Sequence, residues 1–180
     1  MLAFPSTYSV GITSLGFQVV WATLARRADV DVRRLFTDRA DPAHGGQRGR
    51  GPDLDLFGLS LSWELDGPVL LDLLEQRRIP IWAVERGDDD AIVFGGGPVL
   101  TANPEPLAPF FDALLLGDGE LLLPAFIEAL QECRDAPRPE RLRRLAAVPG
   151  VYVPALYAPR YGAGGELLAV DPIGCDVPAR

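Results

Sequence analysis

Four short segments of small and polar residues hold the residue types in this sequence that are best suited to contact a ligand. They are 5–8 (PSTY), 60–64 (SLSWE), 95–98 (GGGP) and 117–120 (GDGE), and each follows an apolar run that predicts a β-strand. Glycines let the backbone approach a ligand closely, and a helix that begins beyond such a segment favours an anionic group such as phosphate. Each segment alone is equally typical of an ordinary strand-to-helix turn.

The carboxyl ends of parallel strands meet at one edge of a sheet, so the four segments are expected to form a common ligand-facing rim. The stretch 101–106 adds a predicted helix start, with Asn103 as its cap, Pro104 at the first helical position and Glu105 in the first turn. The candidate cofactor-binding residues are Ser6, Thr7, Tyr8, Ser60, Ser62, Glu64, Gly95, Gly96, Gly97, Asn103, Glu105, Gly117, Asp118, Gly119 and Glu120.

The rim also holds four carboxylates that are candidates for acid–base pairs, namely Glu64, Glu105, Asp118 and Glu120. They suit equally well the roles of helix caps and partners of helix dipoles, because no nucleophile accompanies them. The only histidine, His44, lies in a glycine-rich segment, and Cys133 and Cys175 are too far apart to form a cysteine cluster. The sequence therefore predicts neither catalytic residues nor a metal site in this chain.

The composition excludes several classes of function. The 180 residues carry a net charge of −8 and include no lysine, which excludes a P-loop lysine, a pyridoxal Schiff base and a lysine general base. The acidic balance argues against nucleic acid as a partner. Neither 95–100 (GGGPVL) nor 117–122 (GDGELL) has the third glycine of a dinucleotide-binding fingerprint. With neither a membrane-length apolar run nor a signal-peptide pattern, we expect a cytoplasmic protein without membrane contact.

Apolar strands alternate with amphipathic helices along the chain, which predicts an α/β fold with a parallel sheet wrapped by helices. The hydrophobic pattern predicts strands at 2–4, 30–36, 56–61, 91–94 and 113–116. It predicts helices at 14–27, 68–78, 120–133 and 140–147, of which the first is capped by Ser14. Residues 37–53 are expected to form a surface loop, and 157–161 and 167–170 flank a glycine-rich turn typical of a β-hairpin.

Several of these segments, taken in order, resemble one protein family. They are 4–36 (FPSTYSVGITSLGFQVVWATLARRADVDVRRLF), 56–66 (LFGLSLSWELD), 95–120 (GGGPVLTANPEPLAPFFDALLLGDGE) and 149–157 (PGVYVPALY). Together they resemble the amino-terminal, cobalamin-binding-like domain of radical S-adenosylmethionine (radical SAM) proteins, in an uncharacterised branch. The resemblance implies a flavodoxin-like, five-stranded parallel sheet with helices on both faces, plus a C-terminal helix and hairpin.

The resemblance also implies how the chain is organised. Residues 1–135 are expected to form the cobalamin-binding-like domain, and 136–180 a helix and hairpin linker that leads toward a radical SAM core. In the family that core holds a [4Fe–4S] cluster in a C-x-x-x-C-x-x-C motif and cleaves S-adenosylmethionine. This chain lacks the motif, so both cofactors are expected only in the missing core, which is the expected partner.

The segment after the first strand departs from the pattern of histidine-ligated cobalamin domains. Those domains carry D-x-H-x-x-G, whereas this sequence has residues 5–11 (PSTYSVG). Either cobalamin binds without a histidine ligand, resting on Ser60, Ser62, Gly95 and Gly96, or the domain is a scaffold. Three interpretations follow: an accessory domain that shapes or covers a radical SAM active site, a self-contained module for a flavin, nucleotide or other anionic ligand, or a nonfunctional fragment.

Overall fold

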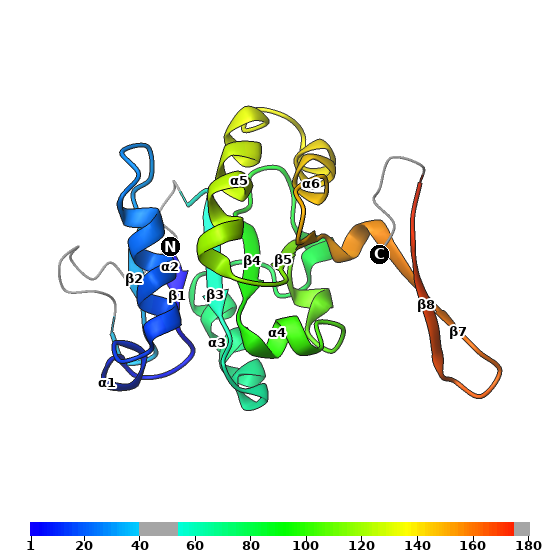
Figure 1. Cartoon of the computed structure of the whole chain (residues 1–180), viewed down its shortest axis with the longest axis horizontal. Helices are drawn as coiled ribbons and strands as arrows, with labels where there is room; N and C mark the ends of the chain where they lie inside the picture. Colours follow the sequence, from blue (N-terminus) through cyan, green and yellow to red (C-terminus); the bar gives the residue numbers. More distant parts are fainter. Residues whose placement is uncertain (40–53, 175–180) are drawn as a thin grey trace.

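A computed structural model describes residues 1–39 and 54–174, and within them a six-stranded sheet forms the centre of the molecule (Figure 1). The strands lie in the order β2-β1-β3-β4-β5-β6, and all neighbours are parallel except β6, which runs antiparallel to β5. The order 2-1-3-4-5 is that of flavodoxin-like, doubly wound sheets. The strands are β1 (Leu2–Ala3), β2 (Arg34–Leu35), β3 (Leu56–Ser60), β4 (Ile92–Gly96), β5 (Ala113–Leu115) and β6 (Val151–Tyr152).

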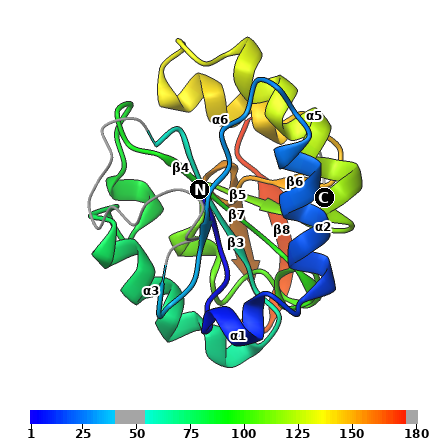
Figure 2. The same ribbon diagram turned by 90° about the vertical axis from the view of Figure 1, so that its left-hand side faces the viewer.

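Helices cover both faces of the sheet (Figure 2). One face packs against α2 (Leu15–Ala25), α5 (Gly119–Glu132) and α6 (Arg138–Ala146). The other face packs against α3 (Gly67–Gln76) and α4 (Pro98–Ala102). Shorter helical turns complete the described part: α1 (Tyr8–Gly11), η2 (Glu64–Asp66), η3 (Ala83–Glu85), η4 (Ala108–Phe110) and η5 (Pro154–Leu156).

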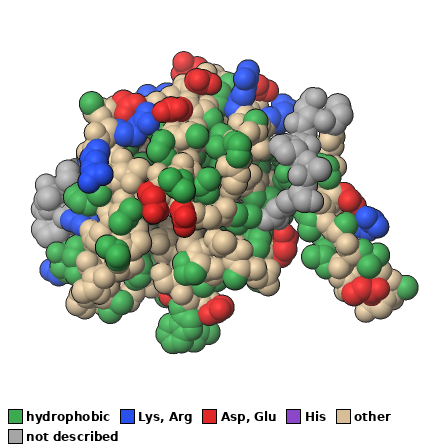
Figure 3. Space-filling view, in the orientation of Figure 1, with side chains coloured by type: hydrophobic (Ala, Val, Ile, Leu, Met, Phe, Trp, Pro, Cys, Tyr) green, Lys and Arg blue, Asp and Glu red, His purple; other side chains and the backbone are tan. Residues whose placement is uncertain are grey.

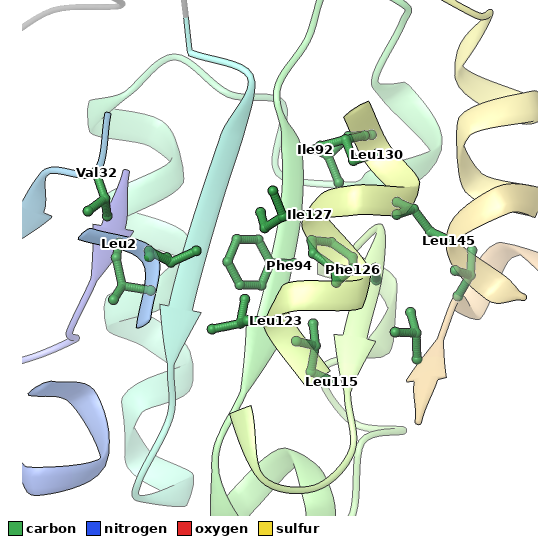
Figure 4. Close-up of a cluster of buried hydrophobic side chains, with 14 of the residues drawn as sticks. Leu2, Val32, Ile92, Phe94, Leu115, Leu123, Phe126, Ile127, Leu130 and Leu145 are labelled. Carbon is green, nitrogen blue, oxygen red and sulfur yellow. The ribbon is translucent and has the colours of Figure 1, made fainter. Parts of the chain in front are cut away.

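Strand side chains alternate between two hydrophobic cores, which is why the strands read as continuous apolar runs. The first core lies under α2, α5 and α6 and includes Phe94, whose ring lies 5.2 Å from that of Phe126 (Figure 4). Phe94 lies over Gly58 of the neighbouring strand, where a Cβ would overlap its ring. The glycine therefore leaves the space that the phenyl ring fills.

A buried charge network ties the loop before β4 to β5 and α6. Asp112 accepts hydrogen bonds from Arg86 Nη1 at 2.9 Å and from the backbone N–H of Val93 at 2.8 Å. The same oxygen, Oδ2, forms an ion pair with Arg138 Nη2 at 2.7 Å. The side chains of Arg86, Arg138 and Asp112 are 0%, 6% and 1% exposed. Burying these charges is tolerable because each guanidinium also donates to backbone carbonyls.

Beyond the sheet, a hairpin of β7 (Tyr157–Tyr161) and β8 (Leu167–Pro172) projects from the body of the molecule (Figure 1). Its turn closes through a hydrogen bond from the Gly162 N–H to the Glu166 carbonyl at 2.8 Å, with Gly165 at φ +84°. The predicted hairpin is thus confirmed, and with it the α/β, flavodoxin-like fold.

Two sequence predictions need correction. The sheet has a sixth strand, antiparallel β6, which the pattern of 151–152 was too short to reveal. No helix begins at Asn103, which instead caps the carboxyl end of α4 with φ −153° and ψ 94°. Pro104 forces this extended conformation on the residue before it, and Pro98 is the proline that opens a helix. His44, Cys175 and most of the predicted loop lie outside the described residues.

Candidate binding cleft at the carboxyl ends of the strands

A cleft of about 670 Å³ opens where β3, β4 and β5 end, which is within the size range of about 300–1,000 Å³ typical of ligand pockets. Its lining comes from these strand ends, from β1, and from the first turns of α2, α4 and α5. The position matches the rule that ligands of open parallel sheets bind near the point where strand order reverses, here between β1 and β3. We refer to it as the carboxyl-end cleft.

Most of the predicted binding residues lie in this cleft. The structure brings together there Ser60, Ser62, Gly95, Gly96, Gly97, Gly117, Asp118, Gly119 and Glu120. They come from three separate strand-to-helix connections, so the parallel sheet alone is what assembles them. Asp118 is the N-cap residue of α5 and Glu120 lies in its first turn, where the helix dipole stabilises a carboxylate.

The remaining predicted residues are placed elsewhere in the described structure. The ring of Tyr8 packs edge-on against Phe36, with centroids 5.1 Å apart, and the Arg39 guanidinium lies 3.7 Å from the Tyr8 ring centroid. Thr7 shares a hydrogen bond with Ser9, and Ser6 accepts one from the Thr37 N–H. These contacts hold the segment after β1 against β2.

Three further candidates also lie outside the lining. Glu105 accepts a hydrogen bond from the hydroxyl of Tyr152 at 3.0 Å, and so ties the segment after α4 to β6. Glu64 is exposed in η2, and Asn103 is exposed at the end of α4.

The cleft also includes residues that the sequence analysis did not select, among them Ser14, Gly16, Val20 and Thr101. The sequence signal that could have identified Ser14 was its predicted role as the cap of a helix. The Ser14 hydroxyl accepts a hydrogen bond from the Phe17 N–H at 3.5 Å, and α2 therefore begins at the carboxyl-end cleft. Every helix that follows a parallel strand begins at this edge, so the first turn of α2 belongs with the candidates.

The cleft glycines fall into two groups with different physical reasons. A Cβ on Gly95 would lie 2.6 Å from Leu100 and from Phe111, and Gly97 has φ +110° with its Cα facing the Leu61 carbonyl. Both are required by packing and backbone conformation. At Gly16 a Cβ would meet nothing within 4 Å, and at Gly96 only ordinary contacts. Gly16 therefore leaves open space in the cleft, and a Cβ at Gly96 would pack against Leu115 without a clash.

Comparison with known proteins decides the family. The family described as radical SAM proteins, N-terminal, matches residues 16–154. This range includes every strand of the sheet except β1. The chain belongs to this family. An uncharacterized protein of Methanocaldococcus jannaschii is 24% identical over 119 residues, which are 66% of this chain and 23% of that protein. The chain thus corresponds to about a quarter of this relative's length, and no solved structure matches it.

The polar lining of this radical SAM N-terminal domain is neutral or acidic. The described residues that line the cleft supply the hydroxyls of Ser14, Ser60, Ser62 and Thr101 and the carboxylates of Asp118 and Glu120, but no arginine. Among the residues that the structure describes, no group of three or more His, Cys, Asp or Glu is placed to hold a metal ion. Within the same residues, no helix is long and apolar enough to cross a membrane.

Large apolar side chains stand exposed beside the cleft of the radical SAM N-terminal domain. Leu15, Trp63 and Leu121 are 77%, 61% and 73% exposed, and each directly adjoins a lining residue in sequence. Leu65, in η2, is 66% exposed. We call these four residues the cleft rim. Apolar groups gathered around an open cleft are typical of a surface that another protein covers.

Proposed function

We propose that this accessory domain docks onto a radical SAM core through its cleft rim, so that the carboxyl-end cleft becomes one wall of the enclosed active site. The observation that carries the proposal is the exposure of the four large apolar side chains of the rim beside the cleft. Covering each of them contributes roughly 1–2 kcal/mol, because they are already partly shielded. The family membership supports this choice of partner, since the matched family is the N-terminal part of radical SAM proteins.

In this proposal the iron–sulfur cluster and S-adenosylmethionine belong to the core. This chain has only two cysteines and so contributes no ligand set for a cluster. Its share of the function is to exclude water from the shared site and to place hydroxyl and carboxylate groups there. Ser60, Ser62 and Asp118 are the side chains positioned for this role.

Cobalamin is the second candidate, as a ligand of the same cleft. The cleft volume of about 670 Å³ and the hydroxyls of Ser60 and Ser62 in its lining fit a large ligand that carries neutral amide groups. No described residue is a histidine, so these residues fit only a cobalamin whose cobalt has no histidine ligand. When bound, cobalamin would supply cobalt chemistry, while this chain would bind and orient its amide edge.

The lining disfavours the alternative of a self-contained module for a phosphate-bearing flavin or nucleotide. Two carboxylates stand at the described cleft surface, and both lie at the N-terminus of α5, where a phosphate would bind. With neither lysine in the sequence nor arginine among the described lining residues, no cationic side chain there offsets their repulsion of an anion.

The docking proposal is tested by titrating residues 1–180 with a separately produced radical SAM core polypeptide, using isothermal calorimetry under anaerobic conditions. The variant Trp63→Ser with Leu121→Ser should weaken binding at least tenfold, because two covered apolar side chains are lost. Val84→Ser is the matched control, since Val84 is 90% exposed and is not among the lining residues of the cleft. Equal affinities of the double variant and the control would refute docking through the rim.

A parallel titration of the full chain with hydroxocobalamin, followed by visible absorption, tests the second candidate. Gly96→Leu adds a bulky side chain to the lining of the cleft and is expected to abolish any binding that the natural chain shows. Binding that persists in this variant would place the corrin elsewhere. A natural chain that does not bind at all would leave the domain as a scaffold for the core.

A further inference from the structure

The projecting hairpin carries its apolar side chains on one face. Strand pairing sets Pro159 opposite Val170 and Arg160 opposite Ala169. Because side chains alternate along a strand, the first pair lies on one face of the hairpin and the second pair on the other. The apolar face holds Tyr157, Pro159, Tyr161, Leu167, Leu168 and Val170.

A bulge near the turn puts two leucines on this face together. Tyr161 pairs with Leu167, whereas the preceding residue, Arg160, pairs with Ala169, which makes Leu168 an extra residue in β8. In a β-bulge two residues of one strand oppose one residue of the other, here the two leucines and Tyr161. Tyr161, Leu167 and Leu168 are 60%, 49% and 55% exposed. We call these three residues the outer apolar face.

The base of the same face is already in contact with the domain. Tyr157 is buried with its ring 5.2 Å from that of Tyr152, and Val170 packs against the second core. The opposite face carries an exposed ion pair between Arg160 and Asp171 at 2.8 Å. The hairpin is therefore an amphipathic two-stranded sheet, covered at its base and uncovered toward its tip.

The turn of the hairpin lies on the side of the molecule where the strands of the sheet end. In Figures 1 and 2 the turn of the hairpin lies toward the lower side, where α1 and α4 mark the carboxyl ends of the strands. Figure 3 shows hydrophobic side chains on the projecting hairpin, separated from the main body. A single partner seated on the carboxyl-end side is thus placed to contact both the hairpin and the cleft rim.

We propose that the outer apolar face of the hairpin is a second docking site for the radical SAM core, distinct from the cleft rim. An isolated two-stranded hairpin is marginally stable in water, so a projecting one with uncovered tyrosine and leucine side chains suits a partner that completes its burial. The relative from Methanocaldococcus jannaschii has about three quarters of its length outside the matched segment, enough chain for such a partner. This inference rests on the proposed docking of the domain onto a core.

The test uses residues 1–180 and the separately produced core polypeptide, in the calorimetric titration already described. Two hairpin variants are compared: Leu167→Ser with Leu168→Ser, and Tyr161→Thr, which retains a residue suited to a strand. Ala158→Ser on the opposite face is the matched control. Each hairpin variant is expected to weaken binding at least tenfold, the control less than twofold, and hydrogen exchange at 157–172 to slow on binding.

Each result separates the hairpin from the rim. Natural affinity in both hairpin variants, with weaker binding in the rim variant, overturns the hairpin proposal and leaves rim docking intact. A natural chain that does not bind the core overturns both. If the chain alone sediments as a dimer that the leucine variants dissociate, the outer apolar face serves a second copy of this chain, and the core is not its occupant.

Discussion

Replacing Asp112 by Asn should destabilise the domain far more than the same change at an exposed ion pair. Asp112 is 2% exposed and its Oδ2 accepts from Arg86 Nη1 at 2.9 Å and lies 2.7 Å from Arg138 Nη2. The asparagine removes the only charge of this network that opposes two buried guanidinium groups. Leaving a buried charge unpaired costs about 3–5 kcal/mol of unfolding free energy.

Asp55→Asn is the matched control, because Asp55 pairs with Arg134 at 3.0 Å while their side chains are 62% and 69% exposed. Such an exposed pair contributes about 0–1 kcal/mol. Urea unfolding followed by far-ultraviolet circular dichroism measures both variants, and thermal unfolding should show a fall in Tm of about 6–20 °C for the Asp112 variant. A difference of less than about 1 kcal/mol between the two variants would refute the assigned role of the buried network.

Three further predictions concern the described residues. Gly58→Ala should destabilise the domain by about 1–3 kcal/mol in the same urea assay, because the added Cβ would overlap a core phenyl ring. Gly16→Ala, in open space on α2, should instead stabilise the domain by about 0.5 kcal/mol. The hydrogen bond from Arg27 lowers the pKa of Asp29 from 3.8 to about 2, so the stability that this carboxylate contributes is present above about pH 4 and lost as the pH falls toward 2. The free energy of unfolding of Asp29→Asn should therefore depend less on pH in that window than that of the natural chain. Burial raises the pKa of the Cys133 thiol, so with the other cysteine replaced by serine, iodoacetamide should alkylate it at pH 8 at least tenfold more slowly than free cysteine, as mass spectrometry would show.

The alternation of apolar strands and helices was sufficient to predict the sheet, because burial on both faces leaves a strong pattern in sequence. The cap at Ser14 was also readable, since an N-cap is a local interaction. The helix expected at Asn103 was wrong because two prolines, Pro98 and Pro104, both suit a helix start and only the first has that role. Strand β6 was not predicted, because its two residues are extended through their pairing with β5 and not through a pattern of their own.

The candidate site was predictable where the strands alone determine it. The connections after β3, β4 and β5 converge because parallel strands end at one edge, which requires no side-chain information. The segment after β1 does not line the cleft, because Tyr8 packs against Phe36 and Arg39, which follow β2. Such contacts between residues about thirty positions apart leave no local pattern. That the described lining contains no arginine likewise became evident only from the structure, because the lining residues come from segments far apart in the sequence.

The short connection between β6 and the hairpin has a consequence for the speed and tightness of assembly. Pro154 opens η5, Tyr157 packs on Tyr152, and the Ile173 N–H donates to the Leu156 carbonyl at 2.7 Å, so both strands of the hairpin are fixed at their base. An arm held in this way is preorganised and loses little conformational entropy when a partner covers it. Flexible residues inserted between 153 and 157 would leave every side chain of the arm in place and still weaken association. The connection at 154–156, and not only the contact surface, is thus a position at which the affinity for a partner can be tuned.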